Sequence, residues 1–282
     1  MKTNIEVKDN VSVVTGAGGT LCSVIAKDLA RQGMQVALLS RTRGKLESVA
    51  DEIRAEGGRA EVYAVDVTDL AAMEETARQV ESDLGPCRVL INGAGGKLTG
   101  SVTTEPQFTP AELEPNSKTL GFFNCDLDIF RSEVELNING TVIPSQCFGR
   151  SMAAHGGGSI VNFASMTSYR ALSKVAPYGA AKAAIVHFTQ WLAAYLAPAS
   201  IRVNAVAPGF FINDRNVKLL YRENGEPSER GAQVLHHTPA NRFGEPRELL
   251  GAVNWLIDDE AAGFVTGITV PVDGGFLACP GV

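Results

Sequence analysis

The sequence predicts an α/β fold in which one parallel sheet is flanked by helices and the whole chain forms a single domain. Three observations lead to this prediction. Short runs rich in β-branched residues alternate with longer helical patterns, as in consecutive β-α-β units. A glycine-rich turn between Thr15 and Thr20 directly follows the first apolar run. No repeat, low-complexity tract or linker divides residues 1–282, so we expect one domain.

Seven apolar runs predict the strands of this sheet. They cover residues 11–15, 36–39, 60–65, 88–91, 159–163, 202–206 and 269–272. Three helical patterns cover residues 21–32, 45–55 and 177–196 approximately, and glycines at positions 33, 57 and 58 mark helix ends. Pro271 lies in the last run. Because proline cannot donate to a ladder hydrogen bond, we expect this run at a sheet edge or a strand end.

The composition limits the classes of partner. The formal net charge is −6, and no cluster of lysines and arginines forms a basic patch, so we expect no nucleic-acid partner. No apolar run approaches the ~20 residues of a membrane span, and residues 1–8 lack the apolar core of a secretory signal, so we expect a cytoplasmic protein without a membrane partner. The cysteines are odd in number and lack the spacing of metal ligands, so we expect reduced, structural thiols and no metal site: Cys22, Cys87, Cys125, Cys147 and Cys279.

Several polar and glycine-rich positions follow predicted strands directly. The turn that begins at Gly16 joins the first strand to the first helix, where backbone amides can bind a pyrophosphate. Asp66 follows the third strand, Asn92 begins a turn after the fourth, and Pro208 and Gly209 follow the sixth. Each of these positions alone is also compatible with an ordinary turn. Because open parallel sheets bind ligands at the carboxyl ends of their strands, together they predict a binding crevice.

Tyr178 and Lys182 are expected to share one face of a helix, because residues four apart lie one above the other. A free tyrosine has a pKa near ~10 and is a poor base at neutral pH. A cation about 4–5 Å away favours the phenolate by roughly 3–4 kcal/mol at an effective dielectric of about 20. We therefore expect Lys182 to lower the pKa of Tyr178, so that the phenol can exchange a proton with an alcohol or carbonyl oxygen.

Taken in order, these motifs resemble those of the short-chain dehydrogenase/reductase family over nearly the whole chain. The matching positions are Thr15 and Gly16 with Gly18 and Gly19, Asp66, residues 92–95, residues 137–140, Ser165, Tyr178 with Lys182, Pro208 with Gly209, and residues 272–275. The resemblance implies a Rossmann-type, doubly wound parallel sheet, a nicotinamide dinucleotide, hydride transfer on a small-molecule substrate, and a homotetramer or homodimer.

By this resemblance the catalytic residues are Asn137, Ser165, Tyr178 and Lys182. Tyr178 is the general acid and base, Lys182 lowers its pKa and holds the nicotinamide ribose, and Ser165 hydrogen-bonds the substrate oxygen. Asn137 supports a water-linked proton path to the lysine. The side-chain chemistry agrees, because hydride transfer leaves or consumes charge on one oxygen, which needs a proton partner and a positioned donor.

The resemblance also implies a set of cofactor-binding residues. They are Gly16, Gly18, Gly19, Thr20, Leu21, Ser40, Arg41, Arg43, Asp66, Val67, Asn92, Gly93, Ala94, Tyr178, Lys182, Pro208, Gly209 and Phe211. The family turn has glycines where this chain has Thr20 and Cys22, and an asparagine where it has Gly93. Because Thr20 and Cys22 are small, we expect the turn to survive, with the Thr20 hydroxyl capping the helix or reaching a phosphate.

The end of the second predicted strand indicates which dinucleotide is preferred. NAD-preferring relatives place an acid there for the ribose 2′-hydroxyl, whereas this chain has Ser40 and Arg41, with Arg43 nearby. A guanidinium would bind the 2′-phosphate that an acid would repel. We therefore predict NADP(H) in preference to NAD(H), although both arginines could also be solvated surface charges.

Two long segments distinguish this chain from a minimal family member. Residues 96–134 follow the fourth strand and are longer than usual connections, so we expect a substrate loop that covers the crevice. Residues 210–240 occupy the place of a mobile substrate lid in relatives. Within the lid, Asn213 stands where many relatives have a threonine, and its amide can still donate and accept hydrogen bonds.

Further matches resemble a subgroup associated with the reduction of fructuronate to mannonate. They are residues 15–22, 188–193, 207–211, 237–239 and 242–244. Such open-chain sugar acids require a cation for the carboxylate and several polar groups for the hydroxyls. Lys97, Arg170 and Lys174 are the candidates for that cation, although each could also be a solvated loop charge.

Three other functions stay open at the level of the sequence. The substrate could be another ketone, alcohol or sugar, for example a ketogluconate. The scaffold could be a nucleotide-binding regulator without turnover, although a sensor needs no proton donor such as Tyr178. Redox-neutral chemistry such as halohydrin dehalogenation would require a blocked cofactor pocket, for which Thr20 and Cys22 are the only hint.

Overall fold

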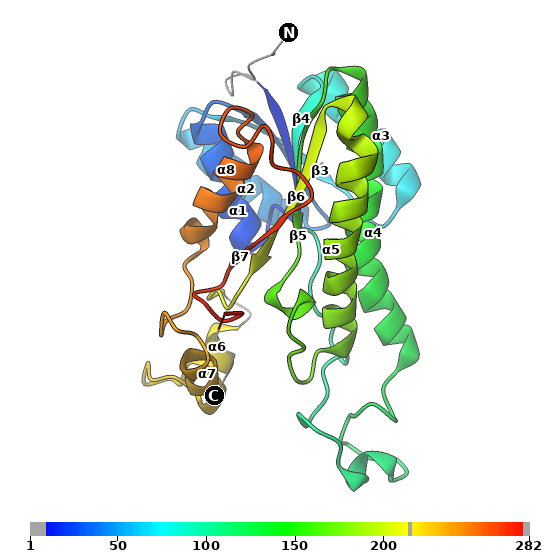
Figure 1. The fold of residues 1–282 in the computed structure, drawn as a ribbon, viewed down its shortest axis with the longest axis vertical. Coiled ribbons are helices and arrows are strands. Elements are labelled where there is room, and N and C mark those ends of the chain that lie inside the picture. The colour runs from blue at the N-terminus through cyan, green and yellow to red at the C-terminus, as the bar shows by residue number, and fades with distance from the viewer. Residues whose placement is uncertain (1–9, 214–215, 279–282) are drawn as a thin grey trace.

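A seven-stranded parallel sheet forms the centre of the protein, in a computed structural model that describes residues 10–213 and 216–278 (Figure 1). The strands are β1 (Val11–Thr15), β2 (Gln35–Ser40), β3 (Arg59–Ala64), β4 (Cys87–Asn92), β5 (Gly158–Phe163), β6 (Ile201–Pro208) and β7 (Thr269–Val272). The predicted α/β fold and all seven predicted strands are confirmed. Residues 1–8, Cys279 and residues 214–215 of the expected lid lie outside the described part of the chain.

Helices cover both faces of the sheet. They are α1 (Thr20–Arg31), α2 (Arg43–Ala55), α3 (Leu70–Asp83), α4 (Leu127–Ala154), α5 (Ala176–Leu196), α6 (Val217–Leu220), α7 (Glu229–His236) and α8 (Leu250–Ile257), with short 3-10 helices η1 (Pro110–Leu113), η2 (Met166–Ser168), η3 (Ala197–Ala199) and η4 (Pro246–Leu249). Figure 1 shows α1, α2 and α8 on one face and α3, α4 and α5 on the other. None of the helices in the described ranges combines the length and apolar character needed to cross a membrane.

Alternation along the strands explains this two-faced core. Successive side chains of a strand point to opposite faces of the sheet. Val14 and Leu38 therefore pack with α1, α2 and α8, whereas Val13 and Leu39 pack with the helices of the other layer. Strands buried on both faces read as nearly continuous apolar runs, which is why their positions are visible in the sequence.

The strand order is β3-β2-β1-β4-β5-β6-β7. The chain runs outward from β1 to β3 and then crosses to β4, so the order reverses between β1 and β4, the position at which open α/β sheets bind their ligands. The register pairs Thr15 with Asn92, which brings the turns after these two strands side by side. β7 lies at the sheet edge, as Pro271 predicts.

Two irregular segments extend beyond the carboxyl ends of the strands (Figure 1). The first was expected to span residues 96–134, but α4 already begins at Leu127, because the Asp126 carboxylate accepts hydrogen bonds from the amides of Asp128 and Ile129. The loop is held by the buried Glu112, whose carboxylate accepts from the amides of Thr109 and Phe123. The second segment, residues 210–240, contains α6 and α7 and is called the lid below.

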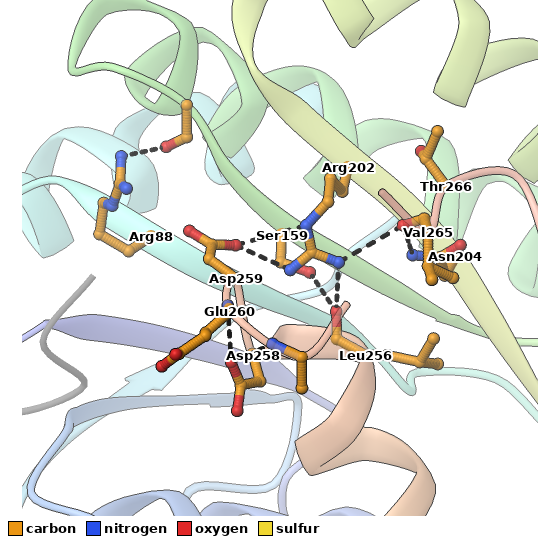
Figure 2. Close-up of polar contacts among 12 residues, drawn as sticks. Arg88, Ser159, Arg202, Asn204, Leu256, Asp258, Asp259, Glu260, Val265 and Thr266 are labelled. Carbon is orange, nitrogen blue, oxygen red and sulfur yellow. Dashed lines mark hydrogen bonds and ion pairs between the residues drawn. The ribbon is translucent and has the colours of Figure 1, made fainter. Parts of the chain in front are cut away.

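A largely buried arginine at the start of β6 joins the sheet to the segment after α8 (Figure 2). The Arg202 guanidinium at the start of β6 donates to the Leu256 carbonyl at 2.6 Å and to the Asp259 carboxylate at 2.8 Å. Its side chain is only 11% exposed. These bonds join β6 to the turn that follows α8, where Asn204 also donates to the Val265 carbonyl at 3.0 Å.

We expect Arg202→Met to lower the free energy of unfolding by about 2–4 kcal/mol, because the partly buried Asp259 carboxylate loses its arginine donor and the Leu256 carbonyl keeps only the Ser159 hydroxyl. Denaturant unfolding followed by circular dichroism measures this. Arg78→Met is the matched control, since the Arg78–Glu75 pair is exposed and its loss should leave stability essentially unchanged. Equal stability of the Arg202 variant and the wild type would refute the assignment.

Candidate active site

A cleft opens at the carboxyl ends of the strands, at the place where the sequence predicts a crevice. Its cavity volume is about 280 Å³. The turn after β4, the segment after β5, the helix α5 and the lid form its walls, and Ser165, Tyr178 and Lys182 all line it. The structure therefore brings three of the four predicted catalytic residues to one surface.

Tyr178 and Lys182 lie one turn apart on α5, which confirms that they share a face of the helix. The Lys182 amine lies 5.7 Å from the centre of the Tyr178 ring and donates to the Phe163 carbonyl at 2.7 Å. Lys182 is buried, with 4% of the residue exposed. Burial lowers the pKa of Lys182 to about 8, because a low dielectric disfavours the charged form.

The pKa of Tyr178 lies above its ordinary value. Burial is the main cause, and the Glu133 carboxylate raises this pKa further, while a hydrogen bond from the Ser165 hydroxyl acts in the opposite direction. The effect of Lys182 on the pKa of Tyr178 stays a prediction, because Lys182 is not among the groups that shift this pKa in the structure. The lysine amine is engaged by the Phe163 carbonyl, and desolvation of the phenol dominates. Burial therefore favours the protonated form of the phenol, which can donate a proton.

Ser165 and Asn137 are both held by backbone groups. Ser165 caps the short helix η2, where its hydroxyl accepts from the Thr167 amide at 3.2 Å. Asn137 on α4 donates to the Gly96 carbonyl at 2.8 Å and accepts from the Gly96 amide at 3.0 Å. A Cβ atom at Gly95 would lie 2.6 Å from the Asn137 side-chain oxygen and 3.5 Å from the Lys182 amine, so both side chains lie close to Gly95.

The turn after β1 has the features of an anion site. Gly16 has a φ of 67° and approaches the backbone after β4 so closely that a Cβ would lie 2.9 Å from the Gly93 carbonyl oxygen. The first amides of α1, which begins at Thr20, have no intrahelical acceptor and can bind a phosphate. The helix is capped by Gly19 without a side-chain hydrogen bond, so Thr20 does not cap it.

Two of the three departures from the family pattern, Cys22 and Gly93, compensate for each other. Cys22 is buried with 4% exposed, and its sulfur occupies the space in front of Gly93, where a Cβ atom would lie only 2.1 Å from it. The asparagine that the family carries at this position would collide with Cys22. The glycine at 93 therefore makes room for the cysteine at 22, and the turn survives as expected.

The remaining predicted cofactor residues divide into two groups. Leu21, Gly93, Pro208, Gly209 and Phe211 line the cleft, together with Tyr178 and Lys182. The others lie outside it: Gly16, Gly18, Gly19, Thr20, Ser40, Arg41, Arg43, Asp66, Val67, Asn92 and Ala94. Among these, the Asn92 side chain points into the core, where it donates to Ser145 and Asn162, so its contribution is structural rather than a cofactor contact.

The charged residues among the predicted cofactor-binding positions outside the cleft lining lie just after the ends of β2 and β3. The Arg41 guanidinium lies 3.9 Å from the Asp66 carboxylate, and its side chain is 66% exposed. Asp66 is also hydrogen-bonded by the amide and hydroxyl of Thr68. Although burial raises the pKa of Asp66, these bonds and Arg41 outweigh it, so the pKa is lowered. Arg43 instead pairs with Glu47 on α2 at 3.1 Å.

Of the three cations predicted to contact the substrate, only Lys97 lines the cleft, with its amine 5.9 Å from the centre of the Tyr178 ring. Arg170 does not line it, and its guanidinium contacts the Phe276 carbonyl and ring. Lys174 donates to the Thr104 carbonyl of the loop. The structure therefore places Arg170 and Lys174 outside the cleft lining and leaves Lys97 as the predicted substrate cation that faces the cleft.

Arg230 on α7 lines the cleft and was missed by the sequence analysis. The sequence does hold one signal for the helix, since Ser228 caps α7 by accepting from the Gly231 amide. Nothing in the sequence indicates that this helix reaches the cleft. Within residues 10–213 and 216–278, no three His, Cys, Asp or Glu side chains are grouped to hold a metal ion.

These residues fit a dinucleotide. The free amides of α1 and the close approach at Gly16 suit a pyrophosphate, Arg41 stands at the end of β2, and the cleft ends at Tyr178 and Lys182. In chemical terms, a phenol, a hydroxyl and an amine line the same cleft, and these are the groups that proton transfer to or from a bound oxygen requires.

Several known proteins are similar to this chain over nearly its full length. A sequence model of the family described as short chain dehydrogenase matches residues 10–223. An uncharacterized oxidoreductase of Bacillus subtilis (strain 168) is 41% identical over 271 residues, which cover 96% of each chain.

Two solved structures show the same architecture. A candidate D-mannonate oxidoreductase from Haemophilus influenzae with bound NAD is 41% identical, with a TM-score of 0.92 over 98% of this chain and 97% of that one. A candidate NAD(P)-dependent gluconate 5-dehydrogenase from Beutenbergia cavernae, with NADP at low occupancy, is 33% identical, with a TM-score of 0.80 over 98% and 99%.

Proposed function

Because this chain belongs to the short-chain dehydrogenase family and is an NAD(P)-dependent oxidoreductase, we propose that it interconverts a secondary alcohol and a ketone of a sugar acid, such as mannonate and fructuronate. The observation that carries this proposal is the cleft in which Ser165, Tyr178 and Lys182 face the same space as Lys97 and Arg230. The names of the two solved relatives, a mannonate and a gluconate enzyme, support a sugar acid.

The proposed chemistry divides the work among four side chains. The bound nicotinamide would supply or accept the hydride. Tyr178 gives its proton to the carbonyl oxygen in reduction and takes one back in oxidation, while the Ser165 hydroxyl donates to the same oxygen. The Lys182 ammonium stabilises the phenolate that forms. Asn137 holds the Gly96 backbone beside Lys182 and supports a water-linked proton path to that lysine.

We infer a preference for NADP(H) from the end of β2. No acid replaces Ser40 there, and the exposed Arg41 is available to a 2′-phosphate at the cost of its long contact with Asp66. The Arg43 guanidinium is already paired with the Glu47 carboxylate. NAD is the alternative, and the Haemophilus influenzae relative was solved with NAD.

Arg41→Ala is expected to raise the KM for NADPH about 10–50-fold and to change the KM for NADH less than about 3-fold, because hydrogen bonds to charged groups contribute about 1.5–3 kcal/mol. Steady-state kinetics with both dinucleotides measures this. Arg43→Ala is the matched control and should alter neither KM. Equal losses with both dinucleotides, or a wild-type preference for NADH, would show that Arg41 does not select the cofactor.

We further propose a cytoplasmic homotetramer or homodimer. An exposed aromatic row on α5 supports self-association, because Trp191 and Tyr195 stack with ring centres 5.0 Å apart while 53% and 67% exposed. Light scattering of the purified protein measures its mass, and a monomer would exclude this assembly.

The substrate is tested by a panel in which D-fructuronate, 5-ketogluconate, neutral ketoses and a hydrophobic ketone are each supplied with NADPH and with NADH. The proposal expects turnover of a keto acid in preference to the neutral ketones, seen as loss of absorbance of the reduced nicotinamide. A preference for the hydrophobic ketone would show that the substrate is a hydrophobic ketone rather than a sugar acid.

A further inference from the structure

We propose that Lys97 and Arg230 together bind the carboxylate of the substrate, and that the buried Glu133 positions Lys97 for this task. This inference rests on the proposed function, since it assigns the acid group of a sugar acid to one end of the cleft. Lys97 comes from the loop after β4 and Arg230 from the lid, so the two cations reach the cleft from separate elements.

The charges of the cleft favour an anion. The cations Lys97, Lys182 and Arg230 line it, and none of the described lining residues is an acid, although the whole chain carries a formal charge of −6. Lys97 and Arg230 form no ion pair within the described residues. Lys182 is turned to the Phe163 carbonyl, which leaves Lys97 and Arg230 as the cations available to a carboxylate.

Lys97 and Arg230 are close enough to repel each other. Although much of the Lys97 side chain is exposed, the protein around its amine lowers its pKa, and the Arg230 charge lowers it further. A carboxylate between the two would reverse this repulsion and satisfy both groups. The lysine amine also lies 5.9 Å from the Tyr178 ring, so an acid bound there is next to the proton donor.

Glu133 does not line the cleft but contacts the backbone next to Lys97. It is fully buried on α4, one carboxylate oxygen accepts from the Leu98 amide, and the other oxygen has no hydrogen-bond partner among the described residues. One turn further along α4, Asn137 holds both backbone groups of Gly96. The two side chains therefore fix the backbone on either side of Lys97.

Glu133 also acts on the charge of Lys97. Its carboxylate raises the pKa of the lysine and so opposes the effects of burial and of Arg230. Lys97 binds a carboxylate only when it is protonated, so binding weakens as the pH rises through the Lys97 pKa. Removing the Glu133 charge lowers that pKa, and the loss of binding should then begin at a lower pH.

The test compares D-mannonate with the neutral polyol D-mannitol, using turnover and calorimetric binding in the presence of the dinucleotide. Lys97→Met and Arg230→Gln should each weaken D-mannonate binding about 10–100-fold and change D-mannitol binding less than about 3-fold. Lys97→Arg should keep the preference for the acid. Glu133→Gln, which retains an acceptor for Leu98, should move the alkaline limb of kcat/KM for D-mannonate to lower pH.

Two matched controls separate these effects from general damage. Glu135→Gln changes an exposed acid two residues from Glu133, and Arg222→Gln changes an exposed arginine of the lid outside the cleft lining, so neither should alter the preference for the acid. D-mannonate that binds through Lys97 and Arg230 but is not oxidised would overturn the proposed function and leave this subsite standing. D-mannonate that is oxidised with unchanged affinity in the Lys97 and Arg230 variants would overturn the subsite alone.

Discussion

Tyr178→Phe is expected to lower kcat/KM by about 10³-fold or more while the Kd for the dinucleotide changes less than about 3-fold. The substitution removes one oxygen, which is the only group of this side chain that can exchange a proton, and positioned acid–base groups contribute about 10²–10⁴-fold. The ring keeps its packing on α5. Steady-state kinetics gives kcat/KM, and fluorescence titration gives the Kd.

Tyr169→Phe is the matched control for this result. Tyr169 is 52% exposed and lies between Ser165 and Tyr178 in the chain without lining the cleft. Its hydroxyl should be dispensable. Turnover of the Tyr178 variant within a few-fold of the wild type would remove Tyr178 from the mechanism.

Lys182→Met is expected to lower kcat/KM about 10²–10³-fold and, in contrast to the tyrosine variant, to weaken dinucleotide binding as well. Methionine is similar in length and apolar, so it suits this buried position, but it cannot stabilise a phenolate or donate to a ribose. Because the Lys182 ammonium must be charged to stabilise the phenolate, kcat/KM for reduction should fall as the pH rises through about 8.

The Lys182→Met variant should lack this inflection of kcat/KM near pH 8. A general loss of structure would lower kcat/KM but would not remove the inflection. The pH dependence of kcat/KM is therefore the decisive measurement for Lys182. Lys118→Met provides the control, since Lys118 is an exposed residue of the loop outside the cleft lining. An inflection that persists near pH 8 in the Lys182 variant would assign it to another group.

The strands are predictable from the sequence because they are buried on both faces. The first run, residues 11–15, coincides with β1, and the last falls at the sheet edge, one of the two positions predicted from Pro271. The start of α4 was placed too late, although Asp126 is a capping residue that signals it. The helices α6 and α7 are short and depend on tertiary contacts, so periodicity in the sequence does not reveal them.

Site residues could be predicted where the end of a strand fixes their position. They could not be predicted where their position depends on the direction of a side chain. The placement of Ser165, Tyr178 and Lys182 around one cleft follows from strand order and helical spacing. Whether Lys97 or Arg170 faces that cleft depends on the path of a loop, and the position of Arg230 depends on how the lid folds. The packing of the Cys22 sulfur against Gly93 can be seen only in the three-dimensional structure.

The central claim is that this cleft transfers a hydride between a nicotinamide dinucleotide and a sugar acid. The most direct measurement is the change in nicotinamide absorbance when wild-type protein and the Tyr178→Phe variant receive NADPH or NADH with D-fructuronate or 5-ketogluconate. We predict oxidation of the dinucleotide by the wild type that depends on the keto acid, with the activity lost in the variant. Binding of the dinucleotide without turnover of any keto acid, or equal turnover by both proteins, would contradict the claim.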